Sequence, residues 1–165
     1  MVEAAVEEAV ADYADEEVPL GSYAVLIGIF NGLFGGLLLV TRRSRGGLPE
    51  KVGLGDVLLL GVAAFRLSRM LSKDKVTSFL RAPFTEYKGP GGPGEVEELP
   101  RGRGVQRALG ELLICPYCLA QWVAAAFVYG LALRPRATRL VAAVFAVKAI
   151  ADGCQIAYKA AEERK

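Results

Sequence analysis

The sequence predicts an all-α fold, a polytopic membrane helical bundle of about four transmembrane helices. Hydrophobic residues make up 53% of the 165 positions, and the mean hydropathy is positive although 23% of the residues are charged. The charged residues are therefore segregated, and apolar stretches of about 20 residues, enough to cross a hydrocarbon core, separate them. These observations indicate a membrane protein with several spans.

The composition also limits the chemistry. The chain contains no histidine, so it lacks the usual proton shuttle at neutral pH and the commonest metal ligand. Triad hydrolases and most zinc enzymes are thereby excluded. A net charge of +2 gives no reason to expect nucleic acid as a partner. We expect no cofactor and no metal, with the lipid bilayer as partner, and self or another membrane protein beside it.

Residues 1–19 are predicted to form an acidic tail or a short amphipathic helix. Apolar residues recur there at helical spacing, and Pro19 ends the segment. The acidic positions are Glu3, Glu7, Glu8, Asp12, Asp15, Glu16 and Glu17. A four-helix membrane domain over residues 20–158 follows, and residues 159–165 form a charged C-terminal tail.

The first two spans are predicted at Leu20–Thr41 and Val52–Leu71. The first holds no charged residue, and arginines follow it. Asp56, Arg66 and Arg69 interrupt the second. Both arginines fall in its last two turns, where long side chains can reach the headgroups, so the segment still qualifies as a span.

A long polar connection, Ser72–Glu111, separates the first two spans from the last two. Its centre is the Gly- and Pro-rich run Gly89–Gly94. We expect this run to be neither helix nor strand. It predicts a flexible loop near residues 87–104 that tethers two membrane hairpins.

The last two spans are predicted at Leu112–Leu133 and Leu140–Tyr158. A very short basic turn over residues 134–139 joins them. The basic residues of the loops are nearly balanced between the two faces of the membrane. We expect both termini in the cytoplasm, because this orientation also places Arg66 and Arg69 on the cytoplasmic side.

Small residues recur every fourth position on the first and fourth spans, at Gly28, Gly32 and Gly36 and at Ala149, Gly153 and Ala157. Such ridges let membrane helices approach closely. We interpret them as surfaces for packing within the bundle, with oligomerisation as the alternative.

Two groups of charges are candidates for function. Lys148 and Asp152 lie four residues apart, so they share one helix face and form an intramembrane charge pair, which Arg66 or Asp56 would join. We interpret the pair as structural, with an ion or proton path as the alternative.

Arg66, Arg69 and Lys73 form the second group, a basic lipid-facing stripe at the end of the second span. The stripe would hold anionic headgroups or simply set the topology.

The tetrad Cys115-Pro116-Tyr117-Cys118 is the most specific local motif. It matches the dithiol of glutaredoxins, and thiols at a helix N-terminus gain acidity from the helix dipole, so Cys115 and Cys118 are the catalytic candidates. Here the motif opens a membrane span, so only that chemistry would carry over. We favour a packing role, in which Cys115 caps the helix and Pro116 takes its first position. A redox role and metal binding with Cys154 are the alternatives.

The chain also resembles a bacterial family of small multi-pass membrane proteins of unknown function. The resemblance runs from about Gly55 to Asp152 and is carried by AFRLSR at 64–69, DKVT at 74–77, ELLICPYCL at 111–119 and QW at 121–122. It implies a bacterial or phage origin and a membrane location, and it brings no activity, substrate or cofactor.

We therefore predict a structural or interaction component of the bacterial cytoplasmic membrane rather than an enzyme. Two other classes stay open at this point. One is a membrane thiol–disulfide oxidoreductase that uses the two cysteines. The other is a phage holin-type protein that permeabilises the membrane, which the small size, several spans and charged tail suggest.

Overall fold

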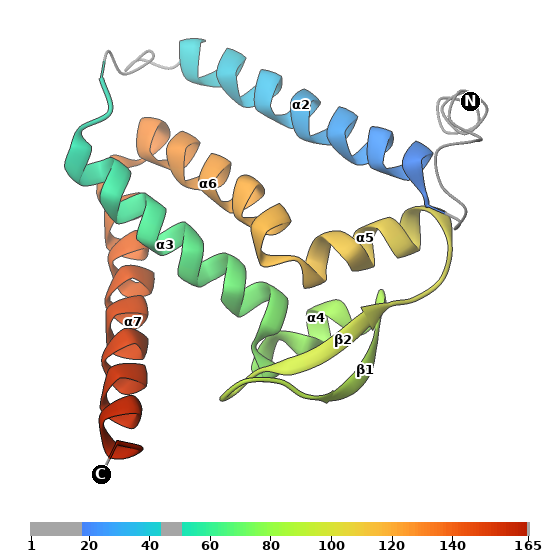
Figure 1. The fold of residues 1–165 in the computed structure, drawn as a ribbon. Helices are drawn as coiled ribbons and strands as arrows, with labels where there is room; N and C mark the ends of the chain where they lie inside the picture. The colour runs from blue at the N-terminus through green and yellow to red at the C-terminus, as the bar shows by residue number, and fades with distance from the viewer. Residues whose placement is uncertain (1–17, 44–50, 165) are drawn as a thin grey trace. The chain divides into compact units, whose positions relative to one another are not determined.

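The computed structural model describes residues 18–43 and 51–164 (Figure 1). The elements are α2 (Leu20–Arg43), α3 (Leu54–Lys73), η1 (Lys75–Thr77), α4 (Ser78–Arg81), β1 (Thr85–Pro90), β2 (Val96–Pro100), α5 (Gly104–Ile114), α6 (Pro116–Leu133) and α7 (Pro135–Glu162). The prediction of a mainly helical protein is confirmed. Residues 1–17 of the predicted acidic segment lie outside the described residues.

The described residues form two compact units. The first contains α2 up to Leu37 together with Met70–Leu119, and the second contains α3 up to Arg69 together with Ala120 onward. Three helices are long and apolar enough to cross a membrane, namely α2, α6 and α7. Helix α3 is not among them, because its charged residues lower its hydropathy.

The predicted third span is broken by a proline. Helix α5 ends at Ile114 and α6 begins at Pro116, so Leu112–Leu133 is two helices instead of one. Cys115 between them is extended, with φ −96° and ψ 103°. A proline disfavours the helical region for the residue before it, which explains the break. Helix α5 also occupies part of the segment expected to be a polar connection.

A second proline has the opposite effect. Pro135 lies at the first position of α7, where its missing N–H removes no helical hydrogen bond. Helix α7 therefore starts inside the predicted basic turn, and Arg136 and Arg139 lie on the helix. The turn between α6 and α7 is shorter than the sequence suggested.

The all-α prediction is wrong in one segment, because the expected tether contains a β-hairpin. Strands β1 and β2 pair antiparallel, with Thr85 opposite Pro100 and Pro90 opposite Val96. The expectation that the Gly-rich run is neither helix nor strand is wrong for Gly89 and Pro90, which end β1. The rest of the run forms the turn, closed by a 3.0 Å bond from the Gly91 N–H to the Glu95 carbonyl. Gly94 takes a φ of 79°, which favours glycine, so the run supplies the conformations that a tight turn needs.

Helix α5 packs on this hairpin at a glycine. A Cβ atom added at Gly110 would lie 2.4 Å from the Phe84 carbonyl oxygen and 3.0 Å from the Pro100 side chain. Any larger residue would push the helix away. Ala108, two residues earlier, is almost completely buried. The small residues of α5 thus set its distance from the strands.

A buried arginine connects the hairpin to the last turn of α3. The Arg81 Nε lies 2.5 Å from a Glu98 carboxylate oxygen on β2, and Arg81 is fully buried. Its Nη1 donates to the Leu71 carbonyl at 2.7 Å, and its Nη2 donates to the Asp74 carbonyl at 3.2 Å. These carbonyls are at the α3 C-terminus, where helical partners run out. Arg81 therefore caps α3 and holds the hairpin at once.

The core of the second unit is built from α3, α6 and α7. It contains mainly alanines of α3 and α7 and, on α6, mainly larger side chains: Leu60, Ala63, Ala64, Val123, Ala125, Phe127, Leu131, Ala142 and Ala146. The alanines let the helix backbones approach closely.

Replacing Arg81 with Met should lower the free energy of unfolding by about 3–5 kcal/mol, because it leaves the buried Glu98 carboxylate without an opposite charge. Adding Glu98→Leu should recover part of that loss. Thermal unfolding of the full chain in detergent would measure both. Lys88→Met is the matched control, since Lys88 pairs with Glu86 at the surface. Equal losses from Arg81→Met and Lys88→Met would contradict the assignment.

Candidate functional site

The structure brings Arg66 of α3 to the charge pair of α7. The Arg66 Nε lies 2.9 Å from the Asp152 Oδ2, and the side chain of Arg66 is only 10% exposed. Lys148 forms an ion pair with the other carboxylate oxygen of Asp152. Lys148 is about half exposed, so Arg66 is the more buried of the two cations. Of the two residues that the sequence offered as a third member, Arg66 takes that place.

Asp56 takes part in a second ion pair between the same two helices. The guanidinium of Arg139 donates to both oxygens of the Asp56 carboxylate, at 2.7 and 2.8 Å. Such a bidentate geometry fixes orientation as well as distance. Asp56 precedes Arg66 on α3, and Arg139 precedes Asp152 on α7, so the two helices run parallel.

The three residues of the basic stripe at the end of α3 do not share one environment. Arg66 is buried against Asp152, whereas Arg69 is exposed. Lys73 lies 3.6 Å from the carboxylate of Glu97 on β2. The three side chains therefore have three different surroundings, and a shared headgroup site would rely chiefly on Arg69.

The glycine ridge of α2 is open within its own unit. A Cβ atom added at Gly28, Gly32 or Gly36 would meet no described atom within 4 Å. Gly153 on α7 is equally open, and Ala157 is exposed. The role of these ridges in helix packing stays a prediction.

The two motif cysteines lie at the junction of α5 and α6, where they are joined in a disulfide with a Cα–Cα distance of 5.3 Å. The Cys118 N–H donates to the Cys115 Sγ at 3.1 Å, and the Leu119 N–H donates to the Cys115 carbonyl at 3.0 Å. Cys115 thus occupies the N-cap position of α6. Cys154 is free and lies on the exposed side of α7.

A tyrosine that the sequence did not single out connects α2 to this region. The Tyr23 hydroxyl donates to the Glu111 carboxylate, and the Arg107 Nε donates to the same carboxylate at 3.0 Å. Glu111 lies one helical turn before Cys115 on α5. The acid nearest in sequence to the dithiol is therefore already held by a cation and a hydroxyl.

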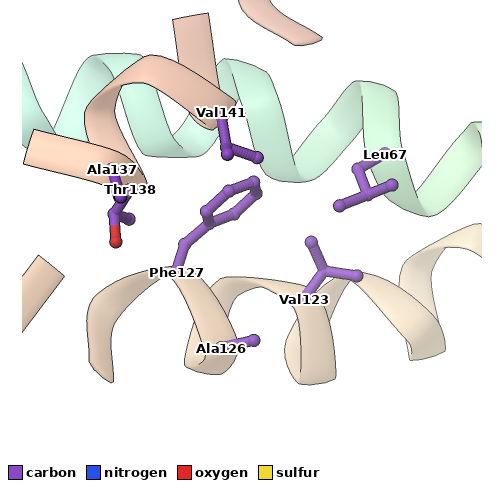
Figure 2. A pocket seen from close by; sticks show the side chains of 7 residues that line it. All are labelled: Leu67, Val123, Ala126, Phe127, Ala137, Thr138 and Val141. Carbon is purple, nitrogen blue, oxygen red and sulfur yellow. The ribbon is translucent and has the colours of Figure 1, made fainter. Parts of the chain in front are cut away.

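The second unit contains a cavity of about 280 Å³ between α3, α6 and α7. Figure 2 shows Phe127 extending from α6 toward Val141 of α7, with Leu67 of α3 on the far side. Its lining is Leu67, Val123, Ala126, Phe127, Ala137, Thr138 and Val141. The Thr138 hydroxyl donates to the Arg134 carbonyl at 3.0 Å, so the lining is suited to hydrocarbon.

Two groups of described side chains could take part in chemistry as well as packing. They are the dithiol of Cys115 and Cys118 and the charged group of Arg66, Lys148 and Asp152. Among the described residues, no group of three or more His, Cys, Asp or Glu side chains is placed to hold a metal ion. The dithiol motif and the Lys148–Asp152 spacing were visible in the sequence. The Asp56–Arg139 and Arg81–Glu98 pairs were not, because their members lie 83 and 17 residues apart.

The fold and these pairs define a small helical protein with three apolar helices able to cross a membrane. The chain belongs to the family described as "Protein of unknown function (DUF1360)", whose model matches residues 59–158. It is also similar to the "Sporulation protein YjcA" of Bacillus subtilis (strain 168), with 33% identity over 98 residues that cover 58% of this chain and 83% of the relative. No solved structure matches the chain.

The matched region contains the hairpin, α5, α6 and most of α3 and α7. Arg66, Cys115, Cys118, Lys148 and Asp152 all fall inside it. Helix α2, with its glycine ridge, lies outside, as does Asp56. Family membership, expected from the sequence over a similar range, is thereby confirmed.

Replacing Asp152 with Leu should destabilise the protein mainly through Arg66, because Arg66 is the more buried cation beside it. A double-mutant cycle of Arg66→Met with Asp152→Leu should give a coupling free energy of about 0.5–3 kcal/mol. The cycle of Lys148→Met with Asp152→Leu should give a smaller value. Thermal unfolding in detergent would measure both, and Arg69→Met serves as the control. A larger coupling for Lys148 would reverse the ranking of the two cations.

Proposed function

We propose that the protein is a four-span integral component of the bacterial cytoplasmic membrane, with a structural or interaction role. One observation carries the proposal. Only 6%, 22% and 11% of the most apolar 18-residue stretches of α2, α6 and α7 are buried inside the described chain. Water would face the rest in a soluble protein, whereas a bilayer would solvate it.

The ion pairs support α3 as an additional span, the second along the chain. Charged side chains inside a bilayer are costly unless they are paired. Two of the four charged residues of α3, Asp56 and Arg66, are paired with charges of α7. Arg69 and Lys73 fall in the last two turns, within reach of the headgroups.

The direction of α3 and α7 supports the same topology. The two ion pairs make these helices parallel neighbours. In a four-span chain the second and fourth spans run in the same direction, because the third returns between them. Parallel packing of α3 and α7 is therefore what this topology requires, and it keeps both termini on one side, which we assign to the cytoplasm.

The hairpin and α5 then belong to the cytoplasmic face in this proposal. The connection between the second and third spans contains them, together with Arg101, Arg103 and Arg107. Such a folded connection offers a surface to other proteins. A role in sporulation, the process named for the Bacillus subtilis relative, is one setting for that interaction.

Membrane fractionation tests the first part of the proposal. The protein should stay with the membrane through alkaline carbonate washing and leave it only with detergent, because three apolar helices cannot be covered by this chain alone. A soluble marker and a peripheral protein are the controls. Release by carbonate would refute the integral assignment.

Cysteine labelling tests the number of spans. In a chain whose three native cysteines are replaced by Ser, Lys51→Cys should react with an impermeant maleimide added to intact spheroplasts. Lys88→Cys should react only after lysis, because α3 separates the two positions across the bilayer. Lys159→Cys is the matched control for the C-terminus and should behave like Lys88→Cys. Labelling of Lys51→Cys and Lys88→Cys from the same face would show that α3 does not cross.

A further inference from the structure

We infer that Cys115 and Cys118 form a reversible thiol–disulfide site that exchanges electrons with the dithiol of a partner protein. In this reaction Cys118 is the sulfur that is attacked and Cys115 is the thiolate that leaves. The inference adds an activity to the proposed membrane role, and it stands on the geometry of the α5–α6 junction rather than on the number of spans.

The backbone at the junction allows both redox states. The disulfide joins residues whose Cα atoms lie 5.3 Å apart, inside the ordinary range for a disulfide. Cys115 is extended between two helices, and Cys118 lies in the first turn of α6. The same turn can hold two thiols without any rearrangement of the helices, because the loop that the disulfide closes is a helical turn already formed by main-chain bonds.

The junction stabilises a thiolate at Cys115 in preference to one at Cys118. The Cys118 N–H points at the Cys115 Sγ from 3.1 Å. The Cys115 sulfur also sits at the N-terminus of the 18-residue helix α6, where the helix dipole favours negative charge. Both effects act on the same sulfur atom, so Cys115 is the better leaving group when the disulfide is attacked.

Nearby charge does not oppose that thiolate. Glu111 is the acid closest in sequence, one turn earlier on α5. Its carboxylate accepts hydrogen bonds from Arg107 and Tyr23. The bond to Arg107, at 3.0 Å, places a compensating positive charge beside it. The negative charge of Glu111 is therefore compensated, while the helix dipole and the Cys118 N–H both favour a thiolate at Cys115.

The two cysteines also differ in exposure to an incoming thiolate. Cys118 is an exposed residue, and the neighbouring Tyr117 is 88% exposed, whereas Cys115 is only partly exposed. An incoming thiolate therefore reaches the Cys118 Sγ more easily. Exposure and leaving-group stability select the same direction of attack.

The reaction balances with a dithiol partner. A partner thiolate attacks the Cys118 Sγ, forms a mixed disulfide, and expels Cys115 as a thiolate, which takes up the proton lost by the partner. The second partner thiolate then attacks the partner's own sulfur in the mixed disulfide and releases Cys118, which is protonated in turn. Two electrons have moved from the partner dithiol to the Cys115–Cys118 pair, and the partner leaves as a disulfide.

The test uses the purified full chain in detergent with Cys154→Ser, oxidised, and a thioredoxin that retains only its attacking cysteine as the probe. Acid quenching followed by peptide mass spectrometry would locate the mixed disulfide. We expect the probe on Cys118 and a free thiol on Cys115. No adduct would overturn the redox site, and an adduct on Cys115 would overturn the assigned direction.

Equilibration of the same protein in dithiothreitol buffers provides the second readout. Alkylation with a mass-tagged maleimide should reveal one reversible transition in which both thiols appear together. A pair that cannot be reoxidised after reduction would indicate packing alone. Cys115→Ser should lose the transition and keep its melting temperature, since a serine can also cap α6. Membrane fractionation of that variant keeps this result separate from the proposed membrane role.

Discussion

Pairing of charges in apolar surroundings is the constraint on which this structure depends. The described part of the chain buries three charged residues, Arg66, Arg81 and Glu98, and each lies beside an opposite charge. An isolated charge removed from water costs several kcal/mol, so such residues are tolerated only in pairs with further hydrogen bonds. Arg81 shows this most fully, since it also donates to the last carbonyls of α3. The Arg81 guanidinium thus joins the hairpin to that helix end, together with the ion pair of Lys73 with Glu97 and the bond from the Lys75 N–H to the Gly94 carbonyl.

The same constraint determines how the apolar helices are used. Asp56 and Arg66 of α3 are paired with Arg139 and Asp152 of α7. Parallel α3 and α7 are therefore held by two ion pairs, while small side chains bring the backbones together. The apolar cavity beside them offers no unsatisfied polar group from Thr138. The charges of the second unit pair α3 with α7, and the redox site that we infer lies at the α5–α6 junction.

Proline explains why that junction exists. Pro116 forces Cys115 out of the helical conformation, which divides one apolar stretch into α5 and α6 and creates a new helix N-terminus at the cysteines. The sequence showed the motif and the helix start that Cys115 would cap. It did not show that α5 turns back onto the hairpin through Gly110, or that Tyr23 and Arg107 hold Glu111. The contacts of Gly110 and Tyr23 join segments that are far apart in the chain, so no local pattern reports them. Arg107 and Glu111 lie four residues apart on one helix, a spacing that the sequence does show.

The sequence by itself determined the helical character and the ranges of α2, α6 and α7 to within a few residues, because apolar periodicity and length are local properties. The motifs between Ala64 and Trp122 also carried a resemblance to the family. The sequence also placed Lys148 and Asp152 on one helix face.

Tertiary structure decided what the Gly89–Gly94 run becomes, since glycine and proline permit both a tether and a tight turn, and only the pairing of β1 with β2 selects the turn. It also decided which charges meet. From the sequence, Arg66 belonged either to the lipid-facing stripe or to the group around Lys148 and Asp152. The fold brings it within 3 Å of Asp152, and an opposite charge stabilises a buried guanidinium.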